Sequence, residues 1–162
     1  MRIKSAEAWW VSIPIETARQ HRSDFGTLTT FDAAILRIET EDGLVGWGES
    51  HHARSPGSIR HLINTTLRGF VVGMDATDTV GIWARIYKFQ LGSHGMGAAT
   101  AMAMSGIDQA LWDIRGKAVG WPLYKLLGGS NKQITLQPVS VEGSVGLNVA
   151  AGVAEITLEY VK

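Results

Sequence analysis

The chain has 162 residues, a length that suits one domain, and its 15 Lys and Arg residues balance 15 Asp and Glu residues. The zero net charge argues against a nucleic-acid-binding protein and against a polybasic membrane-surface protein, because both carry a basic excess. Hydrophobic residues make up 45% of the chain, which is enough for a packed core, but no apolar run is long enough to span a membrane. The chain has no cysteine and no apolar N-terminal signal, which favours a cytoplasmic location.

Alternating apolar residues near the N-terminus predict a three-stranded antiparallel meander. The expected strands are residues 2–14, 31–40 and 44–50. A turn at Gly43 joins the last two strands, because glycine supplies the positive φ that such turns require. Gly46 and Gly48 in the third strand indicate that another element packs closely against it. In the first strand, four apolar residues share one parity and are expected on one face: Ile3, Trp9, Val11 and Ile13.

After residue 58 the pattern becomes helical. Helices are expected at 59–67, after the Thr77-Asp78 cap and, longest of all, at about 99–119. Small and apolar residues in the long helix recur at spacings of three and four, which predicts one buried stripe. Gly120 ends this helix, and a short helix follows Pro122. The order of elements predicts an α+β fold in which a helical bundle follows the meander.

The last 32 residues differ from the rest of the chain. A strand over 134–143 and the beginning of a helix over 153–162 are expected there. Neither element can bury its apolar face alone, so a domain that stopped here would be poorly closed. We therefore expect residues 1–130 to form one domain and residues 131–162 to be the incomplete start of another, in a sequence that is cut rather than finished.

Two segments carry a resemblance to a known family. They are TEDGLVGWGES (40–50) and MSGIDQALWDIRGKAVGWPLYKLLGGS (104–130). Both resemble segments of the N-terminal capping domain in the mandelate racemase/muconate lactonizing group of the enolase superfamily, and the order of elements agrees over about residues 1–130. Residues 140–162 resemble, less closely, the first strand and helix of that family's barrel. The resemblance implies an enolase-like capping domain with at most the first β/α unit of a (β/α)8 barrel.

Enzymes of this family abstract the proton α to a substrate carboxylate with a Lys or His base, while bound Mg²⁺ stabilises the enediolate. Their metal ligands and bases lie on the barrel, which takes roughly 250 residues. Because 32 residues follow the cap here, no catalytic residue and no metal ligand is carried over to this sequence. The chain alone is expected to be inactive, and the complete protein to bind Mg²⁺ and a small carboxylic acid and to form a homo-oligomer.

The resemblance also gives a role to two polar segments, residues about 17–30 and about 50–57. In the family, two cap loops at these positions close over the barrel mouth, exclude water and select the distal group of the substrate. Arg binds a carboxylate in a fork, and His and Asp hydrogen-bond hydroxyl groups, which favours a polyhydroxylated acid. The candidate substrate-binding residues are His21, Arg22, Asp24, His51 and Arg54.

Metal binding and general-acid catalysis were also considered for residues of the loops and of the long helix. His51 and His52 are adjacent in an extended segment and point to opposite faces, which argues against a metal site. Asp108 lies beside the apolar stripe of the long helix, where an unpaired carboxylate costs several kcal/mol, on the order of 2–7 for an unbonded polar group. We therefore interpret Asp108 as structural, and Trp112 and Trp121 as packing anchors at the junction with the barrel.

Three functions remain open at this point. The His, Arg and Asp content of the loops favours the cap of an acid-sugar dehydratase. A racemase, epimerase or cycloisomerase of the same group is the first alternative, because Phe25 and Leu28 leave room for an apolar substrate. The second alternative is a stand-alone, non-catalytic cap-like binding module. A partner or self-association would then have to cover its exposed surface of Trp and Leu side chains.

Overall fold

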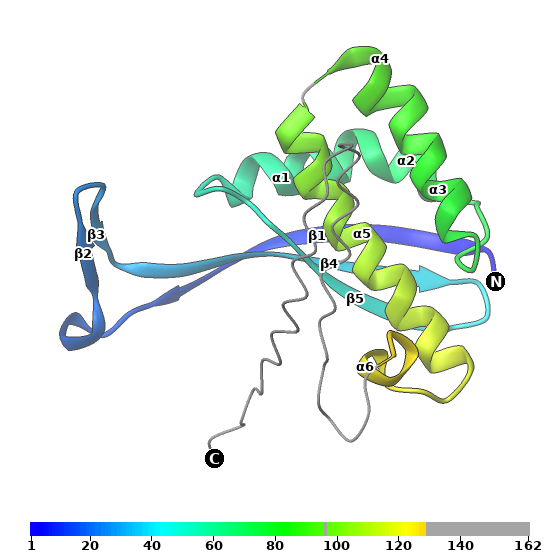
Figure 1. The fold of residues 1–162 in the computed structure, drawn as a ribbon, viewed down its shortest axis with the longest axis horizontal. Coiled ribbons are helices and arrows are strands. Elements are labelled where there is room, and N and C mark those ends of the chain that lie inside the picture. The colour runs from blue at the N-terminus through cyan, green and yellow to red at the C-terminus, as the bar shows by residue number, and fades with distance from the viewer. Residues whose placement is uncertain (96, 129–162) are drawn as a thin grey trace, which may run out of the picture. The chain divides into compact units, whose positions relative to one another are not determined.

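The computed structural model describes residues 1–95 and 97–128 (Figure 1). The chain divides into two compact units, Met1–Gly120 and Trp121–Lys162. In the second unit the described helix is α6 (Leu123–Leu126), which follows Pro122 as predicted. The strand expected over 134–143 and the helix expected over 153–162 lie outside the described residues, so the proposed boundary at residue 130 stays a prediction.

The first unit contains the predicted antiparallel meander. Its strands are β1 (Ile3–Pro14), β4 (Thr30–Thr40) and β5 (Val45–Ser50). They form one sheet in the order β1-β4-β5. The two longest strands, β1 and β4, pair over most of their length. Gly43 in the turn between β4 and β5 has φ +86°, the conformation for which glycine was expected. The α+β fold expected from the sequence is confirmed.

The outward face of β1 differs from the prediction. A register shift between Ile3 and Ser5 marks a β-bulge, which reverses the alternation of every later residue in the strand. Ile3 is therefore buried with Ala6 and Ala8, on the face that the helices cover. The prediction that four apolar residues of β1 share one face is wrong, because three of them lie on the other face and are 37–56% exposed: Trp9, Val11 and Ile13.

Three helical stretches cover one face of the sheet. The first runs from α1 (Pro56–Leu62) through a π-helical turn (Ile63–Leu67) to α2 (Arg68–Val71). The second runs from α3 (Thr79–Ile86) through a π-helical turn (Tyr87–Leu91) to α4 (Gly92–His94), and the third is α5 (Gly97–Ala118). Asp78 caps α3 as predicted, since its side chain accepts a hydrogen bond from the Gly81 N–H at 2.8 Å. None of the helices in the described ranges combines the length and apolar character needed to cross a membrane.

Helix α5 lies directly on β5 (Figure 1). An added Cβ at Gly46 would lie 2.1 Å from the Ala110 carbonyl oxygen, and one at Gly48 would lie 2.0 Å from the Gly106 carbonyl oxygen. The close approach predicted from these glycines is confirmed. Most of the predicted stripe of α5 is also buried, namely Ala103, Gly106, Ile107, Ala110, Leu111 and Ile114, while the predicted members Ala99 and Met102 are partly buried.

Side chains of α5 bond to the outer edge of β5. The Trp47 N–H donates to Asp113 Oδ2 at 2.9 Å, and the N–H two residues later donates to Gln109 Oε1 at 3.1 Å. Lys117 Nζ donates to the Val45 carbonyl at 2.7 Å and to Asp113 Oδ2 at 2.6 Å. These bonds replace the missing neighbour strand, because buried or edge backbone groups are otherwise left without a protein partner.

Asn64 serves the opposite edge of the sheet. Its Oδ1 accepts from the Ala8 N–H at 2.8 Å, and its Nδ2 donates to the Ala8 carbonyl at 2.9 Å. One side chain thus pairs both backbone groups of one β1 residue. Asn64 lies in the π-helical turn Ile63–Leu67, which places the amide against the strand.

Candidate functional site

The polar segment between β1 and β4 forms a small hairpin rather than an irregular loop. After a 3-10 turn (Thr17–Arg19), strands β2 (His21–Ser23) and β3 (Gly26–Leu28) pair in antiparallel fashion. Figure 1 shows this hairpin extending from the ends of β1 and β4. Five of the six residues in these two strands are exposed, so the sequence shows no alternation of apolar and polar residues there. For that reason the segment was expected to be a loop.

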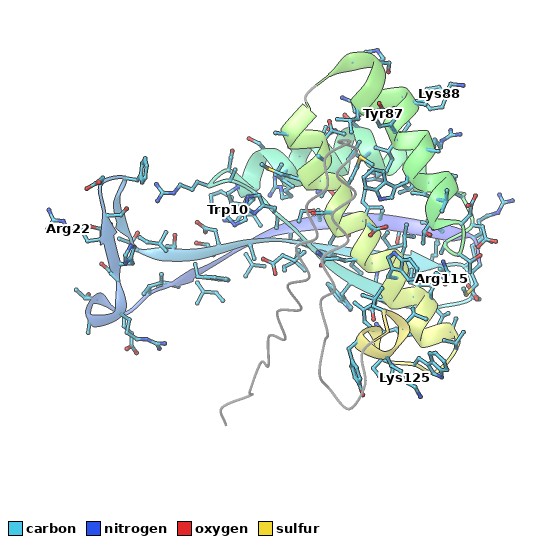
Figure 2. All side chains as sticks on the ribbon, viewed as in Figure 1. Trp10, Arg22, Tyr87, Lys88, Arg115 and Lys125 are labelled. Carbon is cyan, nitrogen blue, oxygen red and sulfur yellow. The ribbon has the colours of Figure 1, made fainter. Side chains whose placement is uncertain are left out.

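Three of the predicted ligands lie on this hairpin. His21 pairs with Leu28 and Arg22 pairs with Thr27, while Asp24 lies in the turn between the strands. All three side chains are exposed, and Arg22 points away from the sheet and the helices (Figure 2). Among the described residues they form no ion pair with one another. Their role in substrate binding remains a prediction.

The second polar segment turns sharply between β5 and α1. Ala53 and Arg54 have φ +43° and +65°, a left-handed conformation that costs of order 1–3 kcal/mol for a residue other than glycine. This turn brings the Arg54 guanidinium to the hairpin, where Nη1 donates to the Phe25 carbonyl at 3.3 Å. The guanidinium carbon also lies 5.8 Å from the centroid of the Phe25 ring. Arg54 therefore ties together the two segments that the sequence analysis singled out.

A cavity of about 330 Å³ opens between these segments. It is lined by Thr27, Leu28, Thr29, Thr30, Phe31, Asp32, His52 and Arg54. Of the five predicted ligands, Arg54 is the one that lines it, and His51 is exposed beside it. Hydroxyl groups, a guanidinium and an imidazole are suited to a polyhydroxylated anion, whereas Leu28 and Phe31 supply an apolar wall.

Asp32 and His52 organise the floor of this cavity, and neither was predicted as a site residue. The Asp32 carboxylate accepts from Trp10 Nε1 at 3.0 Å and from Thr30 Oγ1 at 3.1 Å. Hydrogen bonds from Trp10, then Ser12 and Thr30, lower the pKa of Asp32, and it stays ionised. The one signal in the sequence is that Asp32 is a charged residue within the first, apolar half of its strand, between Phe31 and Ala33.

His52 is fixed by its Nε2, which donates to the Asp32 carbonyl oxygen at 2.8 Å. A carbonyl only accepts, so Nε2 carries the proton of this hydrogen bond. Nδ1 is buried without a hydrogen-bond partner among the described residues. The His51 ring stacks beside it, with ring centroids 6.2 Å apart.

The described residues do not form a metal centre. Within residues 1–95 and 97–128, no three His, Asp or Glu side chains are grouped so that they could hold an ion. Among these described residues, His51 and His52 have no third His, Asp or Glu ligand grouped with them.

Comparison with known proteins identifies the family. The model for the N-terminal domain of mandelate racemase/muconate lactonizing enzyme matches residues 5–128. A second model, of a protein family of unknown function (DUF992), matches residues 116–159. The D-galactonate dehydratase of Xanthomonas axonopodis pv. citri (strain 306) is 44% identical over 109 residues, which cover 63% of this chain and 27% of that protein.

Solved structures agree. A member of the enolase superfamily from Polaromonas sp. JS666 superposes with a TM-score of 0.74 and 47% identity, over 82% of this chain and 35% of that one. A mandelate racemase/muconate lactonizing enzyme homologue from Roseovarius nubinhibens ISM, complexed with magnesium, gives a TM-score of 0.66 and 29% identity, over 80% of this chain and 34% of that one. The chain thus spans about a quarter of the curated relative and a third of the solved ones. It belongs to the mandelate racemase/muconate lactonizing enzyme family of the enolase superfamily, whose N-terminal capping domain it contains.

Proposed function

We propose that the complete protein is an acid-sugar dehydratase, and that this chain supplies the cap that selects the substrate. The observation that carries the proposal is the 44% identity to a D-galactonate dehydratase over 109 residues. The cavity between the hairpin and the second polar segment (about 50–57) supports it, because threonine hydroxyls, His52 and Arg54 line one space. We include in the proposal a dependence on Mg²⁺, a homo-oligomeric assembly and a cytoplasmic location.

The reaction expected is the loss of water from a 2,3-dihydroxy acid. The C2 proton leaves to a base, the C3 hydroxyl leaves with a proton as water, and the resulting enol becomes a 2-keto-3-deoxy acid. Mg²⁺, when bound, would offset the negative charge on the substrate carboxylate, and its ligands are expected outside residues 1–95 and 97–128. The cap residues would bind the distal hydroxyl groups of the sugar acid and exclude water.

The test uses the full-length protein that contains this chain, assayed with Mg²⁺ on D-galactonate, D-gluconate, mandelate and cis,cis-muconate. The expected result is release of a 2-keto-3-deoxy acid from a sugar acid, with no turnover of the other two substrates. Turnover of mandelate or muconate, with none of either sugar acid, would show that the racemase or cycloisomerase alternative is correct. Binding of a sugar acid without turnover would favour the stand-alone binding module.

A pair of arginine variants tests the role of the cap cavity in the same assay. Arg54→Ala removes a cation that lines the cavity, and we expect KM for the sugar acid to rise about tenfold or more, as for the loss of a charged hydrogen bond. Arg68→Ala removes an exposed arginine on α2, away from the cavity, and should leave KM unchanged. Equal effects of the two variants would argue against a substrate contact at Arg54.

A further inference from the structure

The face of the sheet opposite the helices carries a continuous group of large apolar side chains. Trp9, Val11 and Ile13 alternate on this face of β1, and Phe31 of β4 lies opposite Ile13. The Trp47 ring of β5 lies 6.2 Å from the Trp9 ring, measured between centroids. We call these five residues the outer apolar patch. An antiparallel sheet with one face in water normally places polar residues there, so the patch indicates a surface that is covered in the assembled protein.

The size of the outer apolar patch suits one half of a dimer interface. Its five side chains are 37–58% exposed, which leaves roughly 500 Å² of apolar surface in water if a large side chain offers about 200 Å². A dimer interface of standard size buries about 800 Å² on each partner, and about 65% of a homodimer interface is apolar. The apolar area that one partner has to supply is therefore also about 500 Å².

A free carboxylate lies at one end of the outer apolar patch, on β1. Glu7 is exposed and pairs in register with Arg37 of β4. The Arg37 guanidinium, however, bonds to Glu39, with Nη2 donating to Oε2 at 2.7 Å, and Lys4 bonds to the same carboxylate at 2.9 Å. Among the described residues Glu7 forms no ion pair, so its charge remains available to another molecule.

A free guanidinium lies at the opposite end of the outer apolar patch. Arg19 is exposed at the end of the 3-10 turn Thr17–Arg19. It lines a hollow of about 440 Å³ together with Pro14, Ile15, Glu16 and Phe31, and Phe31 is a member of the patch. Within the described ranges Arg19 pairs neither with Glu16 nor with any other acidic group.

These two charges cannot meet within one chain. Glu7 and Pro14 are separated by roughly 24 Å along β1, at about 3.4 Å per residue, and Arg19 lies beyond Pro14. In a two-fold dimer the same patch is used by both copies, and every contact occurs twice. A face with opposite charges at the two ends of an apolar centre complements itself when a second copy packs on it in antiparallel orientation. This self-complementarity selects a second copy of the chain as the occupant.

We propose that the outer apolar patch is a two-fold interface between two copies of this chain, with Glu7 of each copy facing Arg19 of the other. Trp9 and Trp47 lie at its centre, where buried tryptophans contribute most to association. The β-bulge between Ile3 and Ser5 then has a role, because it moves the later apolar residues of β1 from the core to this interface. The proposal rests on the homo-oligomeric assembly included in the proposed function and is independent of the reaction.

The first test is a charge swap in the full-length protein, with association measured by analytical ultracentrifugation. We expect the wild type to be a dimer or an assembly built from dimers. Glu7→Arg and Arg19→Glu should each weaken association at least tenfold, because each replaces two attractions by two repulsions. The double variant Glu7→Arg/Arg19→Glu should associate within threefold of the wild type. Arg68→Glu reverses an exposed charge on α2, on the helical side, and should change nothing.

The second test needs no charge reversal. Glu7→Cys/Arg19→Cys is treated with bismaleimidoethane, a short thiol cross-linker, and should give a band of twice the chain mass on a denaturing gel. Each single cysteine variant should not, since equal positions on the two copies lie far apart in an antiparallel arrangement. The double variant keeps the patch itself intact.

Three results would overturn the proposal: a monomeric wild type, charge reversals that leave association unchanged or are not rescued by the swap, or no cross-link specific to the double cysteine variant. The patch would then be covered by a later part of the same chain or by a different protein. Turnover of the sugar acids is measured in parallel, so that an inactive dimer would refute only the reaction and an active monomer only the interface.

Discussion

Replacing Gly48 with alanine would place a methyl group at the closest contact between β5 and α5. The new Cβ would lie 2.0 Å from the Gly106 carbonyl oxygen, 2.9 Å from its carbonyl carbon and 3.0 Å from the Ala110 nitrogen. Ordinary contacts of a Cβ begin near 3.4 Å. All three neighbours are backbone atoms, so no side-chain rotation relieves the clash, and α5 has to move off the sheet.

The cost follows from this geometry. Overpacking by one methyl group costs about 1–3 kcal/mol when side chains can adjust. Here the displacement of α5 would also stretch its hydrogen bonds to the edge of β5, so we expect about 3 kcal/mol or more. For a domain of this size about 1 kcal/mol corresponds to roughly 3–5 °C, which gives a fall in Tm of about 10 °C or more. Thermal unfolding by circular dichroism measures it.

Gly69→Ala is the matched control. Gly69 is an exposed residue of α2, and an added Cβ there meets no atom within 4 Å. The same substitution should therefore be neutral or stabilise the chain by about 0.4–1 kcal/mol, since alanine favours the helix. A Gly48→Ala variant whose Tm lies within about 2 °C of the wild type would refute the close packing of α5 on β5.

Three further predictions concern single side chains. Asn64→Ala removes both hydrogen bonds to Ala8 and should cost about 1–3 kcal/mol in urea unfolding, so an unchanged midpoint would contradict the role given to Asn64 at the edge of β1. Arg54→Ala should speed amide hydrogen exchange in the β2–β3 hairpin several-fold without lowering Tm, and unchanged exchange would show that the hairpin is held by other contacts. The pKa of Asp32 is lowered on folding, so its contribution to stability is present above pH 3.8 and is lost as the pH falls through its folded value. Asp108 has the opposite sign: its pKa is raised, so stability is lost as the pH rises from 3.8 through its folded value, and Asp108→Asn should remove that slope in pH-dependent melts.

The meander and the helix–sheet packing could be predicted because each leaves a local signal. Gly43 marks a turn, and Gly46 and Gly48 mark a strand on which a helix lies without side chains between them. The face of β1 could not be predicted, since the bulge between Ile3 and Ser5 depends on pairing with β4 rather than on any residue type. Hairpin β2–β3 escaped prediction because its residues stay in water and so show no alternation.

Part of the candidate site could also be predicted from the sequence, and part could not. Arg54 was predicted from its charge and its place in a polar segment, and the structure puts it on the cavity. Asp32 and His52, which also line the cavity, are held there by hydrogen bonds between segments about 20 residues apart in the chain. The left-handed turn at Ala53 likewise has no sequence signal, because alanine rarely adopts positive φ. Geometry between distant segments was therefore the part that the sequence did not reveal.

The bonds from α5 to the rim of β5 also limit how this chain can associate with others. An edge strand with free N–H and carbonyl groups recruits strands from other molecules and so promotes aggregation. Gln109, Asp113 and Lys117 lie one helical turn apart, and they occupy those groups along β5. A further strand therefore cannot pair with β5 unless these hydrogen bonds from α5 first break. A partner that binds at this edge of the sheet has to do so through side chains.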